Sequence, residues 1–168
     1  MDYRKGRVLG PPGIWRNICI EPIFYFPSRK VARNREPTTL SVGVTNYDRC
    51  LREYWLIGEI DGVLPDGWVE KHINEVIMVM RTPKGYHIYL DYRSRNPLKV
   101  VHAGYRLKVL DRGHLSIGKR RKDHYLVLRV FGKYLSDPYI RPVLVNEEKM
   151  SLWHLQVLRL ITSFYVSL

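Results

Sequence analysis

The sequence predicts an α+β fold in which helices cover one face of a mostly antiparallel sheet. Short segments rich in β-branched and aromatic residues outnumber the segments that have helical periodicity. One helical pattern lies between the second and third strand-like segments, and another closes the chain. This interleaving is typical of an α+β sandwich, and it leaves the other face of the sheet available for binding.

The chain has 168 residues, of which 45% are hydrophobic, and this is enough for one domain with its own core. No repeat or low-complexity linker divides the sequence. We therefore expect a basic, flexible arm over residues 1–15, followed by a single domain with a C-terminal helix over residues 16–168.

The net charge of the chain is +12, because 28 Lys and Arg residues face 16 Asp and Glu residues. A field of this sign attracts polyanions, so we expect nucleic acid as the partner. An anionic membrane and a basic surface without a ligand are the alternatives. A single glutamine among many charged residues is typical of a thermophilic source.

The two cysteines, Cys19 and Cys50, stand far apart and form no CxxC pair. We therefore expect neither a zinc site nor a disulfide framework. The first apolar run is interrupted by residues 10–13 and by Arg16, so no signal peptide is predicted and the cytoplasm is the expected location.

The elements of the first half alternate between strand and helix patterns. The first strand is expected within residues 17–26, which are rich in β-forming residues. Residues 45–55 have the composition of a short capped helix, and they lead into an apolar strand over residues 54–61. Residues 65–76 then show apolar side chains near the 3.6-residue helical period.

The second half is mostly strand-like and ends in an apolar segment. That segment, residues 151–168, only just reaches spanning length and contains His154 and Arg159, so we expect a buried or partner-docking helix. Alternation and β-forming residues predict strands over residues 76–82, 86–92, 105–111, 125–132 and 139–145.

Acidic residues end two of the predicted strands. Glu59 and Asp61 are two residues apart in one strand, so they point to the same face. Carboxylates spaced in this way can bind hard divalent cations such as Mg²⁺ or Mn²⁺. Asp111 ends a second predicted strand. Each acid alone is also a common feature of an exposed strand end.

The segment TPKGYH, residues 82–87, joins two predicted strands through a short turn. A glycine at position 85 allows the backbone to approach a ligand closely, and Lys84 and His87 can donate hydrogen bonds to phosphate oxygens. The segment therefore predicts a phosphate site, and an ordinary hairpin with a surface histidine is the alternative.

The order of these motifs resembles the catalytic core of the archaeo-eukaryotic primase superfamily. The resemblance spans roughly residues 50–135 and implies an RRM-like primase core. It implies that Glu59, Asp61 and Asp111 are catalytic and bind Mg²⁺ or Mn²⁺. It also implies a nucleotide site made by Thr82, Lys84, Gly85 and His87, with phosphate or template contacts from Arg129 and Lys133.

The expected function is that of a DNA replication protein which makes primers by two-metal nucleotidyl transfer. Its implied partners are nucleoside triphosphates, a single-stranded DNA template and other primase subunits, with no membrane. Glu59 stands where that family usually has aspartate, and the cysteine-rich zinc elements of many primases are absent. A non-catalytic accessory subunit, as in archaeal primases, is therefore the alternative within the family.

Other classes fit the sequence less well. A rolling-circle nickase would need a His-x-His strand, but Tyr89 stands at the second position. An RRM-like nucleic-acid-binding module would stack bases on aromatic residues, and the chain has 12 tyrosines but no Gly-Phe-Gly-Phe pattern. A structural protein without a ligand is the remaining alternative.

Overall fold

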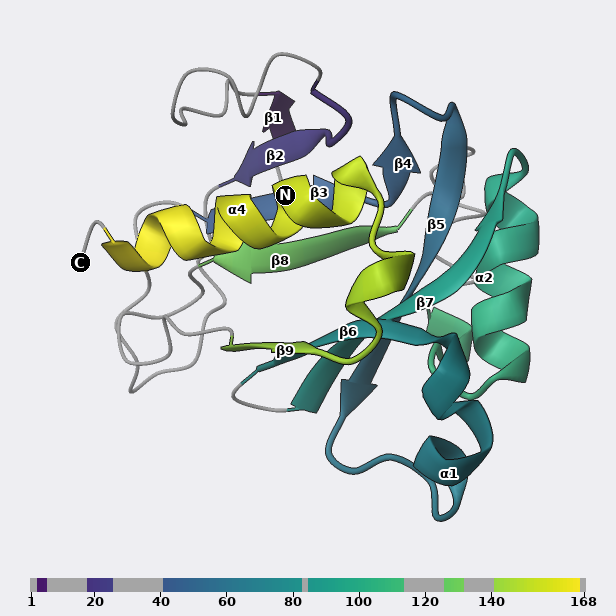
Figure 1. The fold of residues 1–168 in the computed structure, drawn as a ribbon. Coiled ribbons are helices and arrows are strands. Elements are labelled where there is room, and N and C mark those ends of the chain that lie inside the picture. Colours follow the sequence, from purple (N-terminus) through teal and green to yellow (C-terminus); the bar gives the residue numbers. More distant parts are fainter. Residues whose placement is uncertain are drawn as a thin grey trace.

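A computed structural model describes residues 3–5, 18–25, 41–82, 85–113, 126–131 and 141–166. Its strands form two antiparallel sheets, one of four strands and one of five, which are combined with helices (Figure 1). The predicted α+β class with antiparallel strands is therefore confirmed. None of the described helices is long and apolar enough to span a membrane.

The smaller sheet has the order β1-β2-β3-β8. Its first strand falls inside the segment predicted as an arm, and the remainder of residues 1–15 lies outside the described residues. The predicted strand over residues 17–26 is shorter in the structure, because only its second half pairs with β3. The four strands are Tyr3–Lys5 (β1), Pro22–Tyr25 (β2), Ser41–Thr45 (β3) and Val127–Phe131 (β8).

The larger sheet has the order β4-β5-β7-β6-β9. Its three inner strands and β9 lie where the sequence predicts strands. The five strands are Tyr47–Asp48 (β4), Glu53–Asp61 (β5), Val76–Arg81 (β6), Gly85–Ser94 (β7) and Arg141–Leu144 (β9).

The predicted helix over residues 45–55 is wrong, because this segment forms the β4–β5 hairpin. The Asp48 carboxylate accepts hydrogen bonds from the backbone N–H groups of Cys50 at 2.9 Å and Leu51 at 3.1 Å. Arg52 then adopts a left-handed φ of 57°. Aspartate competes well for nearby backbone N–H groups, so a tight turn replaces the helix.

The predicted strand over residues 105–111 is also wrong, because its first residues end the helix α2, Pro97–Arg106. Asn96 caps this helix by accepting a hydrogen bond from the Leu98 N–H at 3.0 Å, and proline occupies the first helical position. Asn-Pro is a known start signal for a helix. Lys108 ends the helical region with a φ of 61°.

The five-stranded sheet carries a core on each face, so the expectation that one face is left available for binding is wrong. One face packs against α2 and α1 (Trp68–His72), which is followed by the short 3-10 helix η1 (Ile73–Glu75). Val100 and Val101 of α2 form a buried cluster with Leu56 and Leu90 of the sheet. The other face packs against the smaller sheet and against α4 (Leu152–Val166). The 3-10 helix η2 (Glu147–Lys149) precedes α4 in the chain.

Helix α4 is buried along one side, as the apolar C-terminal segment predicts, and it lies beside β8 (Figure 1). Leu152 and Leu155 lie on the opposite side, each with 46% of its surface exposed. The buried residues of this helix are Trp153, His154, Gln156, Val157, Leu160 and Ile161.

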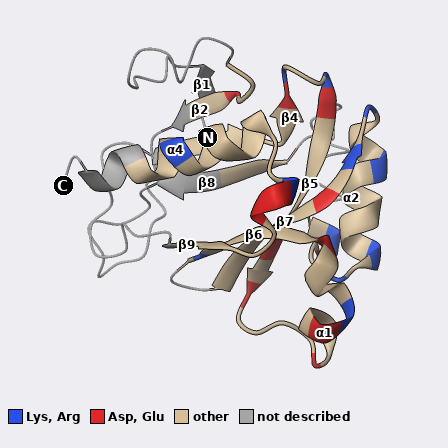
Figure 2. Cartoon of the chain, in the orientation of Figure 1, with Lys and Arg blue, Asp and Glu red and all other residues tan. Residues whose placement is uncertain are grey.

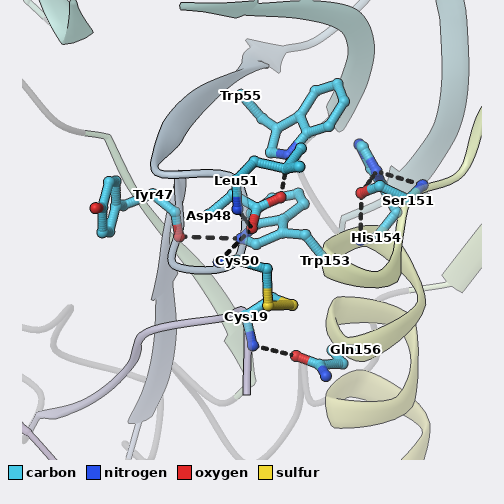
Figure 3. Close-up of a disulfide and its surroundings, with 10 residues drawn as sticks. All are labelled: Cys19, Tyr47, Asp48, Cys50, Leu51, Trp55, Ser151, Trp153, His154 and Gln156. Atoms are coloured by element: carbon cyan, nitrogen blue, oxygen red, sulfur yellow. Dashed lines mark hydrogen bonds between the residues drawn. A yellow bond between two sulfur atoms is a disulfide. The ribbon is translucent and has the colours of Figure 1, made fainter. Parts of the chain in front are cut away.

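A disulfide joins Cys19 to Cys50, so the expectation that the chain has no disulfide is wrong. The backbone carbonyl of Cys19 accepts a hydrogen bond from the Arg49 N–H at 2.8 Å, and its N–H donates to Gln156 Oε1 at 2.7 Å (Figure 3). These contacts connect the segment before β2, the β4–β5 turn and α4. Sequence spacing could not reveal the pairing, because tertiary packing brings the three segments together.

Candidate functional site

The end of β5 brings the first two predicted acids beside the predicted phosphate hairpin. In the β5–β7 register, Glu59 lies opposite His87 and Asp61 lies opposite Gly85. Residues directly opposite each other in a sheet point to the same face, so His87 and the two acids share one face. Figure 2 shows this acidic end of β5 in red.

The turn between β6 and β7 is closed by Thr82 and Gly85. The Gly85 N–H donates to Thr82 Oγ1 at 3.0 Å, and the Thr82 N–H donates to the Gly85 carbonyl at 2.9 Å. A Cβ atom at position 85 would lie 1.8 Å from the Ile60 carbonyl oxygen. The glycine therefore allows β7 to approach β5, which is a structural need separate from any ligand.

The third predicted acid, Asp111, also lies near the end of β5, but it follows the helix α2 and not the strand that the sequence predicts. After α2 the chain runs beside β5, where the Glu59 N–H donates to the Val109 carbonyl at 2.8 Å. Gly58 makes room for this segment, because a Cβ atom there would lie 2.5 Å from Val109 Cβ. Asp111 follows directly and is exposed.

Glu59, Asp61 and Asp111 all line one open cleft of about 880 Å³. Two cations, Arg106 and Lys108, line it as well, and the sequence reasoning missed both. Their signal was their place in the sequence, because both stand within five residues of the predicted acid Asp111. The remaining lining residues are Ile60, Tyr105, Val109, Leu110 and Gly113.

Carboxylates beside cations suit a metal–triphosphate complex, since carboxylate oxygens bind Mg²⁺ or Mn²⁺ and cations bind phosphate. The donor set therefore fits the predicted metals. Glu59, Asp61 and Asp111 do not, however, form a group whose ligand atoms all lie within 4.8 Å of one another. Metal binding would have to draw the side chains together, and two of them, Asp61 and Asp111, are exposed.

Within the described part of the chain, Cys19, Asp48 and Cys50 do form such a group. Both sulfur atoms are used in the disulfide. The Asp48 carboxylate accepts three hydrogen bonds, from two backbone N–H groups and from Trp55 Nε1 at 2.9 Å (Figure 3). The two sulfur atoms and the Asp48 carboxylate already have bonding partners, so the group stabilises the fold in the oxidised protein.

The other predicted site residues either do not line the cleft or lie outside the described residues. His87 is buried, with 7% of its surface exposed, and it does not line the cleft itself. Arg129 belongs to β8, where its backbone pairs with Gly43 in the smaller sheet. Lys84 and Lys133 lie outside the described residues.

The arrangement can bind an anionic ligand through a divalent cation, since its three acids and two cations surround one opening. Fold alone would not assign it a reaction. No family model, curated protein or solved structure matches this chain in the comparisons with known proteins.

Proposed function

We propose that this protein is a member of the primase superfamily that binds a nucleoside triphosphate with Mg²⁺ or Mn²⁺ in the cleft and uses a single-stranded template. One observation carries the proposal. Glu59 and Asp61 of β5 and Asp111 after α2 come from separate segments, yet they line one cleft. Glu59 also lies opposite His87, beside the β6–β7 turn.

In this proposal, the acidic and the basic residues of the cleft would have different roles. The three carboxylates would hold the cations, while Arg106 and Lys108 would bind the phosphate oxygens of the nucleotide. Bound Mg²⁺ or Mn²⁺ would activate a 3′-hydroxyl and stabilise charge on the transferred phosphoryl group. His87 is buried outside the cleft, so it would act through Glu59, which lies opposite it on the neighbouring strand, rather than touch the nucleotide.

A non-catalytic accessory subunit is the second candidate. It is supported by the spacing of Glu59, Asp61 and Asp111, whose carboxylate oxygens are not gathered within 4.8 Å. Such a protein would bind nucleotide or template but would not transfer a nucleotidyl group.

Nucleotide binding is the first test. A methylanthraniloyl-labelled ATP is titrated with the protein, in Mn²⁺ and in EDTA, and binding is followed by fluorescence anisotropy. We expect binding that depends on Mn²⁺, and we expect Asp61→Asn to weaken it about 10- to 150-fold, since an interaction with a charged group contributes about 1.5–3 kcal/mol.

Asp66→Asn is the matched control, because Asp66 is an exposed acid in the turn before α1 and does not line the cleft. Equal losses in both variants, or no Mn²⁺-dependent binding by the unaltered protein, would contradict the proposal. A primer-extension assay then separates the two candidates. Extension that disappears in Asp61→Asn supports a primase, and nucleotide binding without extension supports an accessory subunit.

A further inference from the structure

Helix α2 and the residues beside it are strongly basic. Residues 92–110 contain no Asp or Glu, but they contain five Lys and Arg residues. Figure 2 shows the helix with blue bands and no red. One of these cations, Arg93, is paired with Glu53 at 2.5 Å. The other four are Arg95, Lys99, Arg106 and Lys108, and all four are exposed.

Two cations and one histidine of α2 lie on its outward face. Lys99, His102 and Arg106 have the spacing i, i+3 and i+7, which places them along one side of a helix. All three are exposed, whereas Val100 and Gly104 are buried against the sheet. Seven residues of helix span about 10 Å, so the two ends of this row can contact different phosphates of one strand.

This row leads into the cleft that carries the acids. Tyr105, Arg106 and Lys108 all line that cleft. Tyr105 is 38% exposed, and its hydroxyl accepts a hydrogen bond from Arg112 Nε at 3.3 Å. An exposed aromatic ring beside a row of cations is the combination that binds single strands, because bases stack on the ring while the cations hold phosphates.

We propose that the outward face of α2 is a binding track for single-stranded nucleic acid that ends at the cleft. The proposal rests on the proposed function, for which it supplies the path of the template. Nucleic acid is favoured over an anionic membrane because the exposed row is formed by Lys99, His102 and Arg106, without an aliphatic side chain to insert among lipids.

The test measures binding of a fluorescein-labelled 20-nucleotide oligo(dT) as a function of NaCl concentration. Lys99→Ala combined with Arg106→Ala removes two phosphate contacts. Each contact contributes about 0.7 to the slope of log K against log[NaCl], so the slope should fall by about 1.4 and affinity at 0.1 M NaCl by about 25-fold. Lys99→Ala alone should lower the slope by about 0.7.

Arg49→Ala combined with Arg159→Ala is the control, because it removes the same charge from exposed positions on the β4–β5 turn and on α4. This control should keep the original slope. An equal fall in both double variants would show that only net charge matters, and it would overturn the track. Binding to phosphatidylserine vesicles but not to oligo(dT) would overturn it in favour of a membrane.

Lys99 does not line the cleft, so its substitution separates this proposal from the proposed function. Lys99→Ala should weaken oligo(dT) binding and leave Mn²⁺-dependent binding of the labelled ATP unchanged. If nucleotide binds but Lys99→Ala and Arg106→Ala leave oligo(dT) binding intact, the track is wrong while the nucleotide site stands. A duplex of the same length that competes as well as oligo(dT) would overturn the preference for single strands.

Discussion

Gly85 shows how one residue sets the geometry at the end of β5. A methyl group there would overlap the Ile60 carbonyl, at 1.8 Å, and would approach the Asp61 Cα at 3.0 Å. Both neighbours are backbone atoms, so no side-chain rotation relieves the clash. We expect Gly85→Ala to destabilise the fold by about 1–3 kcal/mol, measured by urea unfolding. Unchanged stability would show that β5 and β7 separate at this point without cost.

Gly62→Ala is an informative comparison for that substitution. Gly62 has a left-handed φ of 92°, but a Cβ atom there meets nothing within 4 Å. Its cost is therefore backbone strain alone, about 1 kcal/mol, whereas the cost at position 85 is a steric clash between strands. Only the clash should also disturb the site, so Gly85→Ala should weaken nucleotide binding more than Gly62→Ala.

His154 makes the stability of the protein depend on pH. The ring is fully buried beside Trp55, and its Nδ1 accepts a hydrogen bond from the Ser151 N–H at 3.2 Å. Burial lowers the pKa of His154 to about 3. The unfolded chain therefore takes up a proton below about pH 6.5 and the folded chain does not, so stability falls as pH falls from about 6.5 towards 3.

From these pKa values, we expect His154 alone to cost about 2 kcal/mol of stability at pH 5 relative to pH 7.5. Urea unfolding at the two pH values measures the change, and His154→Phe supplies the reference. The variant loses the Ser151 hydrogen bond at both pH values, so only the pH-dependent part differs. An identical pH dependence in both proteins would show that His154 is protonated in the fold or exposed.

The disulfide acts at the scale of elements, because it joins the segment before β2 to the β4–β5 turn. It closes a loop across a sequence separation of 31 residues, and a loop of this length stabilises a fold by about 3–4 kcal/mol. Cys50 is exposed, so a solvent reductant can reach the bond. We expect a reductant to lower the melting temperature of the protein.

The matched variant carries Cys19→Ala and Cys50→Ala. It should melt near the temperature of the reduced protein and should not respond to the reductant. Free thiols are counted in parallel to establish that reduction is complete. If two thiols are released per chain and the melting temperature does not change, the disulfide does not stabilise the fold.

At the scale of the whole molecule, the two sheets are joined through the buried Asn46. Its side-chain amide donates to the Trp55 carbonyl at 2.9 Å, and its Oδ1 accepts from the Leu126 N–H at 2.8 Å. Leu126 directly precedes β8 and Trp55 lies in β5, so one side chain holds strands of both sheets. The disulfide and the Cys19–Gln156 hydrogen bond add further contacts near this junction.

Much of the central sheet follows from local pattern. Strands β5, β6 and β7 agree with the sequence predictions because alternation and β-branched residues are local properties. The period of two along a strand also placed Glu59 and Asp61 on one face beforehand, whereas the face of His87 relative to them depends on the β5–β7 register. Helix α2 differs from the sequence prediction because residues 105–111 alternate as a strand does, although Asn96 and Pro97 form a helix start signal.

The sequence by itself determined the class of the fold, the inner strands and the position of Glu59 and Asp61 at the end of β5. The tertiary structure decided that Asp111 reaches the same cleft, since Val109 pairs with Glu59 only after α2 has turned the chain back. It also decided the Cys19–Cys50 pair and the addition of Arg106 and Lys108 to the acids. Periodicity describes neighbours along the chain, whereas these contacts depend on how distant segments pack.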